Sequence, residues 1–495
     1  MVAPDPEGKE RLLQPNSRTR NIFTNAGALV AASLLTRVLS VPVLALLVRT
    51  LSKEDFGQYS YLISFVNLFS ALVTLGLPAF LAREVVQQRD RASVLMKAAY
   101  LLELLLSGLT VVLILFVGQS SQSQNAPWLL AMAAVGMAAA ASATIFQYTI
   151  NGLNYSYITA VIQVVSSLFN SLGLLLATFF SPSVESLILV FFLSGILQHI
   201  LSFWSYQYYF KEIQLAREWP TLQTYSMVLR NSLPYVFLVA FASIYFRIDI
   251  VLLEQWSTIE ELANYSAAYK FIDIIQVIVG LIGGVFFAEF SNMYAREETG
   301  SDLLLKRGFR YMVLISLPLA SLLTFYATDI LQLFYGAKYV QSAGILQILG
   351  WTVVLLFACN LQNALIQAQN YVQVQVFVYG ISSVLNIVLN YFLIPLQGAL
   401  GASIATLLCE LFNFSIFSLF LFKQFRIQLF GWWMVPAFAA FAVMQVVLSV
   451  CSPWPAPLGI TAGVLGFAAA LLLCGGVLPE DIGRAKQIFR RFSLK

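Results

Sequence analysis

Long apolar stretches alternate with short polar segments along almost the whole chain. About 20 predominantly apolar residues are needed for a helix to cross the hydrocarbon core of a bilayer. Stretches of that length predict about fourteen spanning helices, at residues 22–49, 57–82, 93–117, 127–150, 156–180, 184–208, 226–253, 264–290, 309–328, 343–367, 372–394, 399–422, 431–450 and 457–478. The predicted fold class is therefore an all-α polytopic membrane protein.

Composition supports the membrane interpretation. The 495-residue chain is 59% hydrophobic and 11% charged, and its mean hydropathy is +0.80. Soluble domains carry about 25% charged residues. A soluble protein of this length has no means of hiding so much apolar surface, so that class is excluded.

The distribution of Lys and Arg predicts the orientation in the membrane. Of the 28 such residues, three lie deep within predicted spans and three others, Arg49, Lys53 and Lys338, lie on the side opposite the N-terminus; the remaining 22 share the N-terminal side. Positive charge collects on the cytoplasmic side of membrane proteins. We therefore expect a multi-pass protein of the plasma (inner) membrane with both termini in the cytoplasm.

Two parts of the chain resemble each other at half-chain distance. Residues Glu54–Ser60 (EDFGQYS) recur as Glu260–Ser266 (EELANYS), and Asn25 pairs with Asn231 at the same offset. A second block around Asn170 recurs around Asn386. An even number of spans in each repeat gives two lobes of the same orientation, an arrangement typical of carriers that bind near the membrane midplane and rock between two access states.

The repeat and the polar segments predict the division of the chain. We expect two pseudo-symmetric six-helix lobes, two extra C-terminal helices, and polar segments at the ends and between the lobes. The predicted parts are a cytoplasmic N-terminal tail at 1–21, an N-lobe at 22–208, a cytoplasmic linker at 209–225, a C-lobe at 226–422, spans 13 and 14 within 423–478, and a basic cytoplasmic tail at 479–495.

Three basic residues lie well inside predicted spans, away from their ends: Arg37, Arg247 and Lys270. A charge at the bilayer centre costs at least about 2.5–3.5 kcal/mol on insertion scales, so it usually faces a protein cavity or a ligand pathway. These residues predict a cationic cavity and an anionic ligand. The structural alternative is pairing with a carboxylate. Lys270 and Asp273, three residues apart, suit such a pair, whereas Arg247 and Asp249 point to different helix faces.

Other polar residues in the spans are candidates for lining a cavity or coupling transport to an ion. The candidate lining residues are Asn25, Asn231, Asp249, Asp273, Asn360, Gln362 and Asn363; hydrogen bonding between helices is the equally weighted alternative for the amides of span 10. The candidate ion-coupling carboxylates are Glu103, Glu289 and Glu410. His199 is the single histidine, and its position favours a hydrogen-bonded or interfacial role.

No catalytic or metal-binding set can be assembled from the sequence. It offers no His/Cys ligand cluster, no phosphate-cradling Gly-rich loop and no histidine suited to a Ser/His/Asp triad. We therefore expect no enzymatic activity, no catalytic residue, no metal and no cofactor. A gradient of H⁺ or Na⁺ is the candidate driving force.

Several blocks of sequence carry a family resemblance. They are Leu51–Ser60 (LSKEDFGQYS), Phe246–Asp249 (FRID), Tyr265–Lys270 (YSAAYK), Asn386–Pro395 (NIVLNYFLIP) and Gly398–Thr406 (GALGASIAT). Over about residues 20–425 the chain resembles the polysaccharide flippases of the multidrug/oligosaccharidyl-lipid/polysaccharide exporter superfamily, which carry lipid-linked O-antigen-type units. The resemblance implies a V-shaped pair of six-helix lobes.

The resemblance also implies an activity. The family moves an undecaprenyl-pyrophosphate-linked saccharide from the cytoplasmic to the outer leaflet for cell-surface polysaccharide biosynthesis. On that basis Arg37, Arg247 and Lys270 are expected to bind the pyrophosphate, whose oxygens match the guanidinium fork. The expected partners are the lipid-linked saccharide, the bilayer and a polysaccharide polymerase or other assembly proteins; no nucleic acid is expected.

Three alternatives stay open at this point. A cation-coupled multidrug exporter of the same superfamily would favour acidic residues in its cleft and usually has twelve spans. A lipid-linked peptidoglycan-precursor flippase would share the fourteen spans and the cationic cavity. A membrane-embedded glycosyltransferase, phosphotransferase or ligase would need a sizeable soluble loop, and the longest predicted loop, 209–225, is short.

Overall fold

The structure, a computed structural model, describes residues 15–87, 91–119, 127–153, 155–209, 219–298 and 300–476. In these residues every regular element is a helix, which confirms the predicted all-α class. The chain divides into two compact units, Met1–Ser266 and Ala267–Lys495. Most of the predicted linker and the predicted C-terminal tail lie outside the described residues.

The first unit holds nine helices in its described part and the start of a tenth. They are α2 (Pro15–Thr50), α3 (Lys53–Leu68), α4 (Ser70–Thr74), α5 (Leu77–Gln87), α6 (Ala92–Gly118), α7 (Pro127–Gly152), α8 (Ser156–Phe180), α9 (Val184–Tyr209), α10 (Leu222–Trp256) and the first residues of α11 (Ile259–Ala295). The helix α10, which contains the seventh predicted span, packs against α3, α4, α5 and α6. The assignment of the spans to two six-helix lobes stays a prediction.

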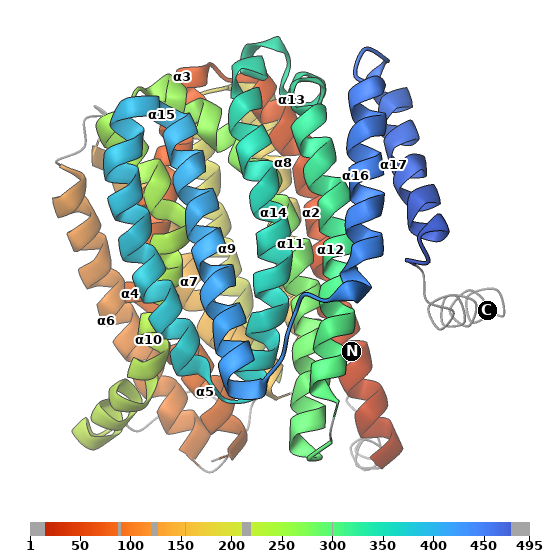
Figure 1. Cartoon of the computed structure of the whole chain (residues 1–495). Coiled ribbons are helices and arrows are strands. Elements are labelled where there is room, and N and C mark those ends of the chain that lie inside the picture. Colours follow the sequence, from red (N-terminus) through yellow and green to blue (C-terminus); the bar gives the residue numbers. More distant parts are fainter. Residues whose placement is uncertain are drawn as a thin grey trace. The chain divides into compact units, whose positions relative to one another are not determined.

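The second unit contains the rest of α11 and the helices that follow it. They are α12 (Ser301–Phe325), α13 (Ala327–Tyr335), η3 (Ala337–Ser342), α14 (Ala343–Ala368), α15 (Val372–Phe425), η4 (Trp432–Met434), α16 (Val435–Val450) and α17 (Ala456–Leu473). Helix α14 packs against both α12 and α15, and α16 and α17 lie side by side as a hairpin (Figure 1). The hairpin packs on α12 through a core that includes Tyr326, Met444 and Phe467.

Twelve helical segments of the described chain are long and apolar enough to cross a membrane. One of them is α15, whose 54 residues cover the predicted spans 372–394 and 399–422 with non-helical backbone angles at Gly398 (φ 55°, ψ −130°). The predicted span 226–253 falls in α10, which is not among the twelve. The number fourteen therefore stays a prediction.

The predicted second span, 57–82, differs from the structure at both ends. The helix α3 begins four residues earlier, because the Ser52 hydroxyl caps it by accepting a hydrogen bond from the Asp55 amide at 3.0 Å. The helical path breaks at Leu75 and Gly76, which both adopt positive φ angles (39° and 70°). The last residues of the predicted span, 77–82, belong to a separate helix, α5.

The core of the first unit is built around α7. Its apolar cluster joins residues of six helices, α5 to α10, among them Phe80, Met96, Phe146, Ile158 and Tyr206. Helices α7 and α9 approach each other closely at two glycines: a Cβ atom added at Gly195 would lie 2.1 Å from the Gly136 carbonyl oxygen. Small residues at helix contacts allow such close packing in membrane proteins.

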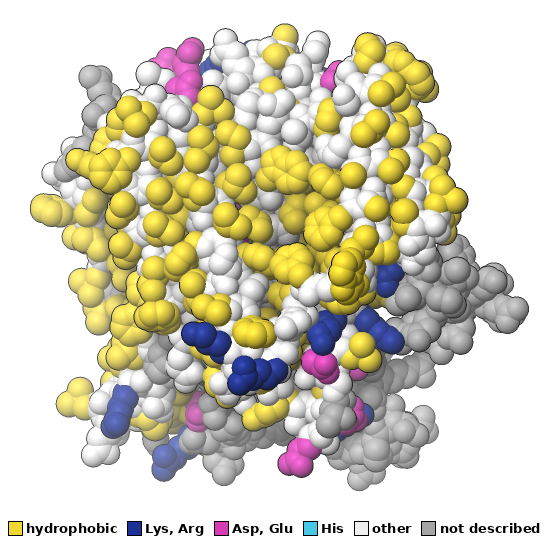
Figure 2. Space-filling model, viewed as in Figure 1, with side chains coloured by type: hydrophobic (Ala, Val, Ile, Leu, Met, Phe, Trp, Pro, Cys, Tyr) yellow, Lys and Arg dark blue, Asp and Glu magenta, His cyan; other side chains and the backbone are white. Residues whose placement is uncertain are grey.

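The surface over the second unit is banded. Figure 2 shows hydrophobic side chains over the middle of this face and most of its Lys and Arg side chains toward one end. An apolar band bordered by charge is the pattern expected for a bundle that spans a bilayer.

Candidate functional site

The two predicted arginines lie on separate helices of the first unit. Arg37 is exposed on α2, which packs against α8. Arg247 is half-buried on α10, which packs against α3. Both positions lie well inside apolar helices, as the sequence predicts; their joint role in one cationic cleft stays a prediction.

The carboxylate of Asp249 has a partner that the sequence did not reveal. Asp249 is 2% exposed, and its Oδ2 accepts a hydrogen bond from the Tyr265 hydroxyl at 2.8 Å. The two residues belong to α10 and α11, sixteen positions apart. Because a pair of this kind depends on how the two helices pack, local spacing gave no signal for it.

The predicted pairing of Lys270 with Asp273 is confirmed. The Lys270 ammonium lies 3.4 Å from Asp273 Oδ2 on one face of α11. Their side chains are 28% and 17% exposed, so both stay partly accessible. The pair lowers the cost of placing each charge in an apolar helix, and it leaves the lysine able to meet a ligand.

A cavity of about 650 Å³ opens beside the N-terminal half of α10. It is lined by Leu75 and by one face of α10, with Ser226, Leu229, Arg230, Ser232, Leu233 and Val236. Arg230 is the one charged residue among this described lining. In the sequence, Arg230 fits the positive-inside pattern, so nothing there indicates that it lines a cavity. Asn231, the next residue, is exposed. The side chain of Asn25 lies outside the described residues.

The amides of span 10 make contacts between helices of the second unit. Gln362 donates to the Ser418 hydroxyl at 2.7 Å, and Asn363 donates to the Tyr379 hydroxyl at 2.8 Å. Asn360 packs against Gly283, where an added Cβ would lie 1.7 Å from its Oδ1. The bonds of Gln362 and Asn363 are hydrogen bonds between helices, the alternative role predicted for these amides. A role in lining a cavity stays a prediction.

The three candidate coupling carboxylates have different surroundings. Glu103 on α6 is fully buried, and neither of its oxygens has a hydrogen-bond partner among the described residues. Glu410 on α15 is 4% exposed. Glu289 on α11 is exposed and lines a cavity of about 350 Å³ together with Arg307. Burial therefore singles out the first two as membrane-embedded acids.

His199 is hydrogen-bonded, as one of its two predicted roles requires. Its Nδ1 lies 2.7 Å from the Ser142 hydroxyl, and its Nε2 lies 3.2 Å from the Tyr100 hydroxyl. The three residues tie together α9, α7 and α6.

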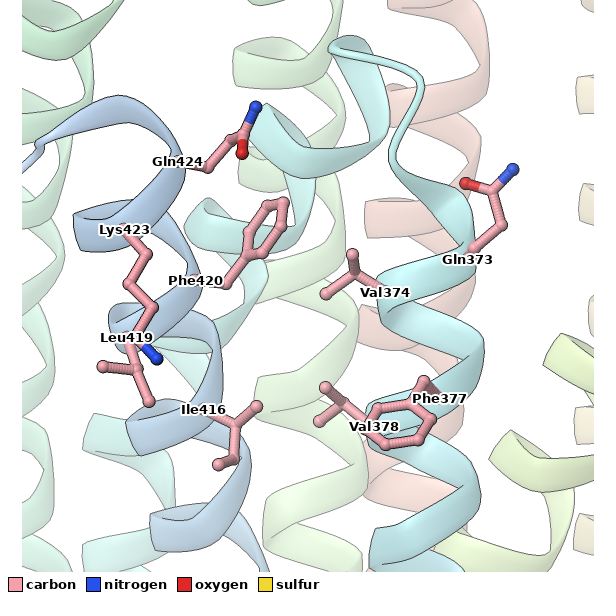
Figure 3. A pocket seen from close by; sticks show the side chains of 9 residues that line it. All are labelled: Gln373, Val374, Phe377, Val378, Ile416, Leu419, Phe420, Lys423 and Gln424. Atoms are coloured by element: carbon pink, nitrogen blue, oxygen red, sulfur yellow. The ribbon is translucent and has the colours of Figure 1, made fainter.

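The second unit carries an apolar groove of about 410 Å³ between the two ends of α15. Figure 3 shows Val374, Phe377 and Val378 on one segment facing Ile416 and Phe420 on the other. Gln373 and Gln424 lie at one end, and the Lys423 side chain extends along its helix toward Leu419 (Figure 3). The groove thus combines an apolar wall with a single cation.

Among the described residues, no group of three or more His, Cys, Asp or Glu side chains is arranged to hold a metal ion. The site chemistry that the structure does offer consists of embedded cations, buried amides and buried carboxylic acids. Side chains of these types are the ones that proteins generally use to bind anionic or polar ligands.

Comparison with solved structures places the fold. The structure is similar to the lipid II flippase MurJ in an inward closed conformation (TM-score 0.71, 16% identity, covering 94% of this chain and 99% of that one). It is also similar to an inward-facing multidrug resistance transporter of the MATE family (TM-score 0.59, 15% identity, 80% and 99% covered). A transporter of the same superfamily from Pyrococcus furiosus matches with a TM-score of 0.58 and 14% identity over 81% of this chain and 95% of its own.

Sequence comparisons point the same way. An uncharacterized membrane protein of Methanocaldococcus jannaschii is 25% identical over 164 residues, and the match spans about a third of either chain (32%). A family model described as MatE matches residues 234–392. The model described as "Polysaccharide biosynthesis protein" matches residues 22–294, more than half of the chain. The chain therefore belongs to the polysaccharide biosynthesis protein family, within the multidrug/oligosaccharidyl-lipid/polysaccharide exporter superfamily of transporters and flippases.

Proposed function

We propose that the chain is a flippase that moves a polyprenyl-pyrophosphate-linked saccharide from the cytoplasmic to the outer leaflet of the plasma membrane, for cell-surface polysaccharide biosynthesis. The observation that carries this proposal is the cavity beside α10, whose described lining has Arg230 as its one charged residue. A guanidinium presents a rigid fork of donors that matches phosphate oxygens. Alternating access of two lobes would expose such a cavity first to one leaflet and then to the other.

The other embedded cations support an anionic ligand. Arg37 and Arg247 lie well inside apolar helices. Lys270 forms an ion pair with Asp273, and its side chain stays 28% exposed. Charges retained at such depth are usually functional, because each one makes membrane insertion less favourable and so needs a compensating role. We propose that these residues guide the pyrophosphate through the carrier.

The groove on α15 supports a ligand with a hydrocarbon tail. Its walls are aliphatic and aromatic side chains, and Lys423 is its single charged residue. That chemistry suits a prenyl chain along the wall with a phosphate near the ammonium. Amides such as Asn360 would suit the hydroxyl groups of a saccharide.

The test is a deletion of the gene complemented with variants, followed by sorting of lipid-linked saccharides by leaflet. We expect the deletion to lose surface polysaccharide and to trap the lipid-linked intermediates on the cytoplasmic side. Wild type and the control Arg296→Ala should restore export, because Arg296 is exposed and its ion pair among the described residues is with Glu298, at 3.5 Å. Arg230→Ala, Arg247→Ala and Arg37→Ala should not. Full rescue by all three at wild-type protein levels would rule out the cationic site.

A second candidate is a flippase for a lipid-linked peptidoglycan precursor. It is favoured by the likeness to the lipid II flippase MurJ, which covers 94% of this chain. In the same deletion strain, accumulation of peptidoglycan precursors with normal surface polysaccharide would favour this candidate. Increased drug sensitivity with both pathways intact would favour a cation-coupled multidrug exporter, the class that the MatE match suggests.

We propose coupling to an H⁺ or Na⁺ gradient without a bound cofactor, both termini in the cytoplasm, and cooperation with a polysaccharide polymerase or other assembly proteins. The concentration of Lys and Arg on one predicted side supports the orientation.

A further inference from the structure

A line of polar side chains runs along one face of α6. It consists of Tyr100, Glu103, Ser107 and Thr110, whose spacing of three or four residues places them on the same face. At about 1.5 Å per residue the line extends roughly 15 Å along the helix. The opposite face carries exposed apolar side chains at Leu105, Leu109, Val112 and Phe116, as expected for contact with lipid.

Three oxygens in this line have no hydrogen-bond partner among the described residues. They are both carboxylate oxygens of Glu103 and the hydroxyl oxygen of Ser107, and all three are buried. Native proteins satisfy nearly all buried polar groups, and an ionised carboxylate without a partner is especially costly to bury. The arrangement fits a carboxyl group that holds a proton.

A hydrogen-bonded chain lies one helical turn from Glu103. The Ser142 hydroxyl donates to the Ala139 carbonyl at 2.9 Å, so its oxygen is free to accept from His199 Nδ1–H at 2.7 Å. That leaves Nε2 as the acceptor for the Tyr100 hydroxyl at 3.2 Å. Tyr100 and Glu103 are three residues apart on the same face of α6, so this chain ends one turn from the Glu103 carboxyl. The site therefore contains a second group, His199, that can take up a proton.

No cation in the described surroundings is positioned to neutralise Glu103. Helices α4 and α7, which pack on α6, contain no Asp, Glu, Lys, Arg or His. Lys97 of α6 lies over the Trp219 ring at 4.5 Å. The other titratable groups on the helices that pack on α6 are Glu84 on α5, Tyr148 on α7, and Tyr225, Arg230, Tyr245, Arg247, Asp249 and Glu254 on α10; the side chains of Arg83 on α5 and Tyr235 on α10 lie outside the described residues. Helix α9, which reaches Tyr100 through His199, adds Glu185, Tyr206, Tyr208 and Tyr209.

We propose that Glu103 is a proton-binding site of the first unit, beside the hydrogen-bonded chain of Tyr100, His199 and Ser142, and that its protonation state is coupled to transport. A proton needs a single acceptor oxygen, whereas metal cations with oxygen ligands need several at once, and the line offers one carboxylate. The coupling rests on the proposed flippase function; the binding of the proton does not.

Infrared difference spectroscopy of the full chain in lipid nanodiscs tests the binding. Wild type at pH 7 should show the carbonyl stretching band of a protonated carboxylic acid, and Glu103→Gln should lose it. The control Glu289→Gln should keep the band, because Glu289 is exposed. His199→Gln should shift the pH at which the band titrates. If Glu103→Gln does not fold, Glu103→Asp should move the band. A band absent from wild type, or unchanged by substitution of Glu103, would overturn the proposal.

Transport by reconstituted protein under an imposed pH gradient tests the coupling separately. Wild type should translocate the lipid-linked saccharide faster with the gradient than without it, and Glu103→Gln should lose that acceleration. Equal rates with and without the gradient in wild type would overturn the coupling alone. Absence of translocation by wild type under all conditions would overturn the flippase function, while the infrared result would still decide the proton site.

Discussion

At the scale of single residues, the structure separates local pairs from pairs made by packing. Lys270 and Asp273 were predicted to pair because i and i+3 positions share a helix face. The bonds of Asp249 with Tyr265 and of His199 with Ser142 join different helices, so the sequence indicated buried polar residues without their partners. Arg230 was missed as a cavity residue because its charge fits the positive-inside pattern equally well.

Removing the Tyr265 hydroxyl should destabilise the protein. Tyr265→Phe leaves the buried Asp249 carboxylate without one donor, a change that typically costs about 1–3 kcal/mol. Thermal unfolding of the detergent-solubilised protein measures the effect. The matched control on the same helix is Tyr294→Phe, since Tyr294 is 48% exposed. Equal melting temperatures for both variants would show that the hydrogen bond contributes nothing.

Exchanging the charges of Lys270 and Asp273 distinguishes a structural pair from a ligand contact. The double variant Lys270→Asp/Asp273→Lys keeps the i, i+3 spacing and so should keep the wild-type melting temperature. Because it moves the cation by about one turn, we expect it to fail in the complementation assay. Full complementation by the exchanged pair would restrict Lys270 to a structural role.

At the scale of helices, apolar length predicted where spans exist better than where they end. The polar half of the predicted span 343–367 is helical in α14, since its amides find partners on neighbouring helices. The predicted span 57–82 breaks at Leu75 and Gly76, whose left-handed backbone leaves no trace in hydropathy. The kink at Gly398, by contrast, falls between two predicted spans. The positions at which helices break therefore depend on backbone geometry that hydropathy does not report.

A methyl group at Gly195 should disrupt the packing of α9 on α7. The added Cβ would meet the Gly136 carbonyl oxygen at 2.1 Å, and neither backbone can give way cheaply. Overpacking of this kind typically costs about 1–3 kcal/mol. Gly195→Ala should therefore lower the melting temperature by several degrees. The control Gly108→Ala has nothing within 4 Å of its added Cβ and should leave the melting temperature unchanged or raise it. A stable Gly195→Ala protein would contradict the close helix contact.

At the scale of the whole molecule, the sequence predicted the class and the family, and the comparisons confirm both. Hydropathy carries the class and the quoted sequence blocks carry the resemblance to the family, and both are distributed over hundreds of residues. The ligand is different, since it depends on a few side chains whose neighbours are set by packing. The number of spans and the side on which the termini lie stay predictions.

Labelling of single cysteines from outside the cell tests the orientation. Ser181 lies between α8 and α9 and is exposed, and the predicted topology places it outside. Glu297 lies between α11 and α12, is exposed, and should lie in the cytoplasm. In a background with Cys474→Ser, Ser181→Cys should react with a membrane-impermeant maleimide in intact cells, and Glu297→Cys should react only after permeabilisation. The reverse pattern would place the termini outside.

Translocation by the purified protein in liposomes tests the central claim most directly. A polyprenyl-pyrophosphate-linked oligosaccharide would be placed in both leaflets, and its accessibility to an external sugar-modifying enzyme would be followed over time. Wild type should make nearly all of the substrate accessible, whereas Arg230→Ala and protein-free liposomes should leave about the inner-leaflet half protected. Protection by wild type equal to that in protein-free liposomes would contradict the assignment as a lipid-linked saccharide flippase.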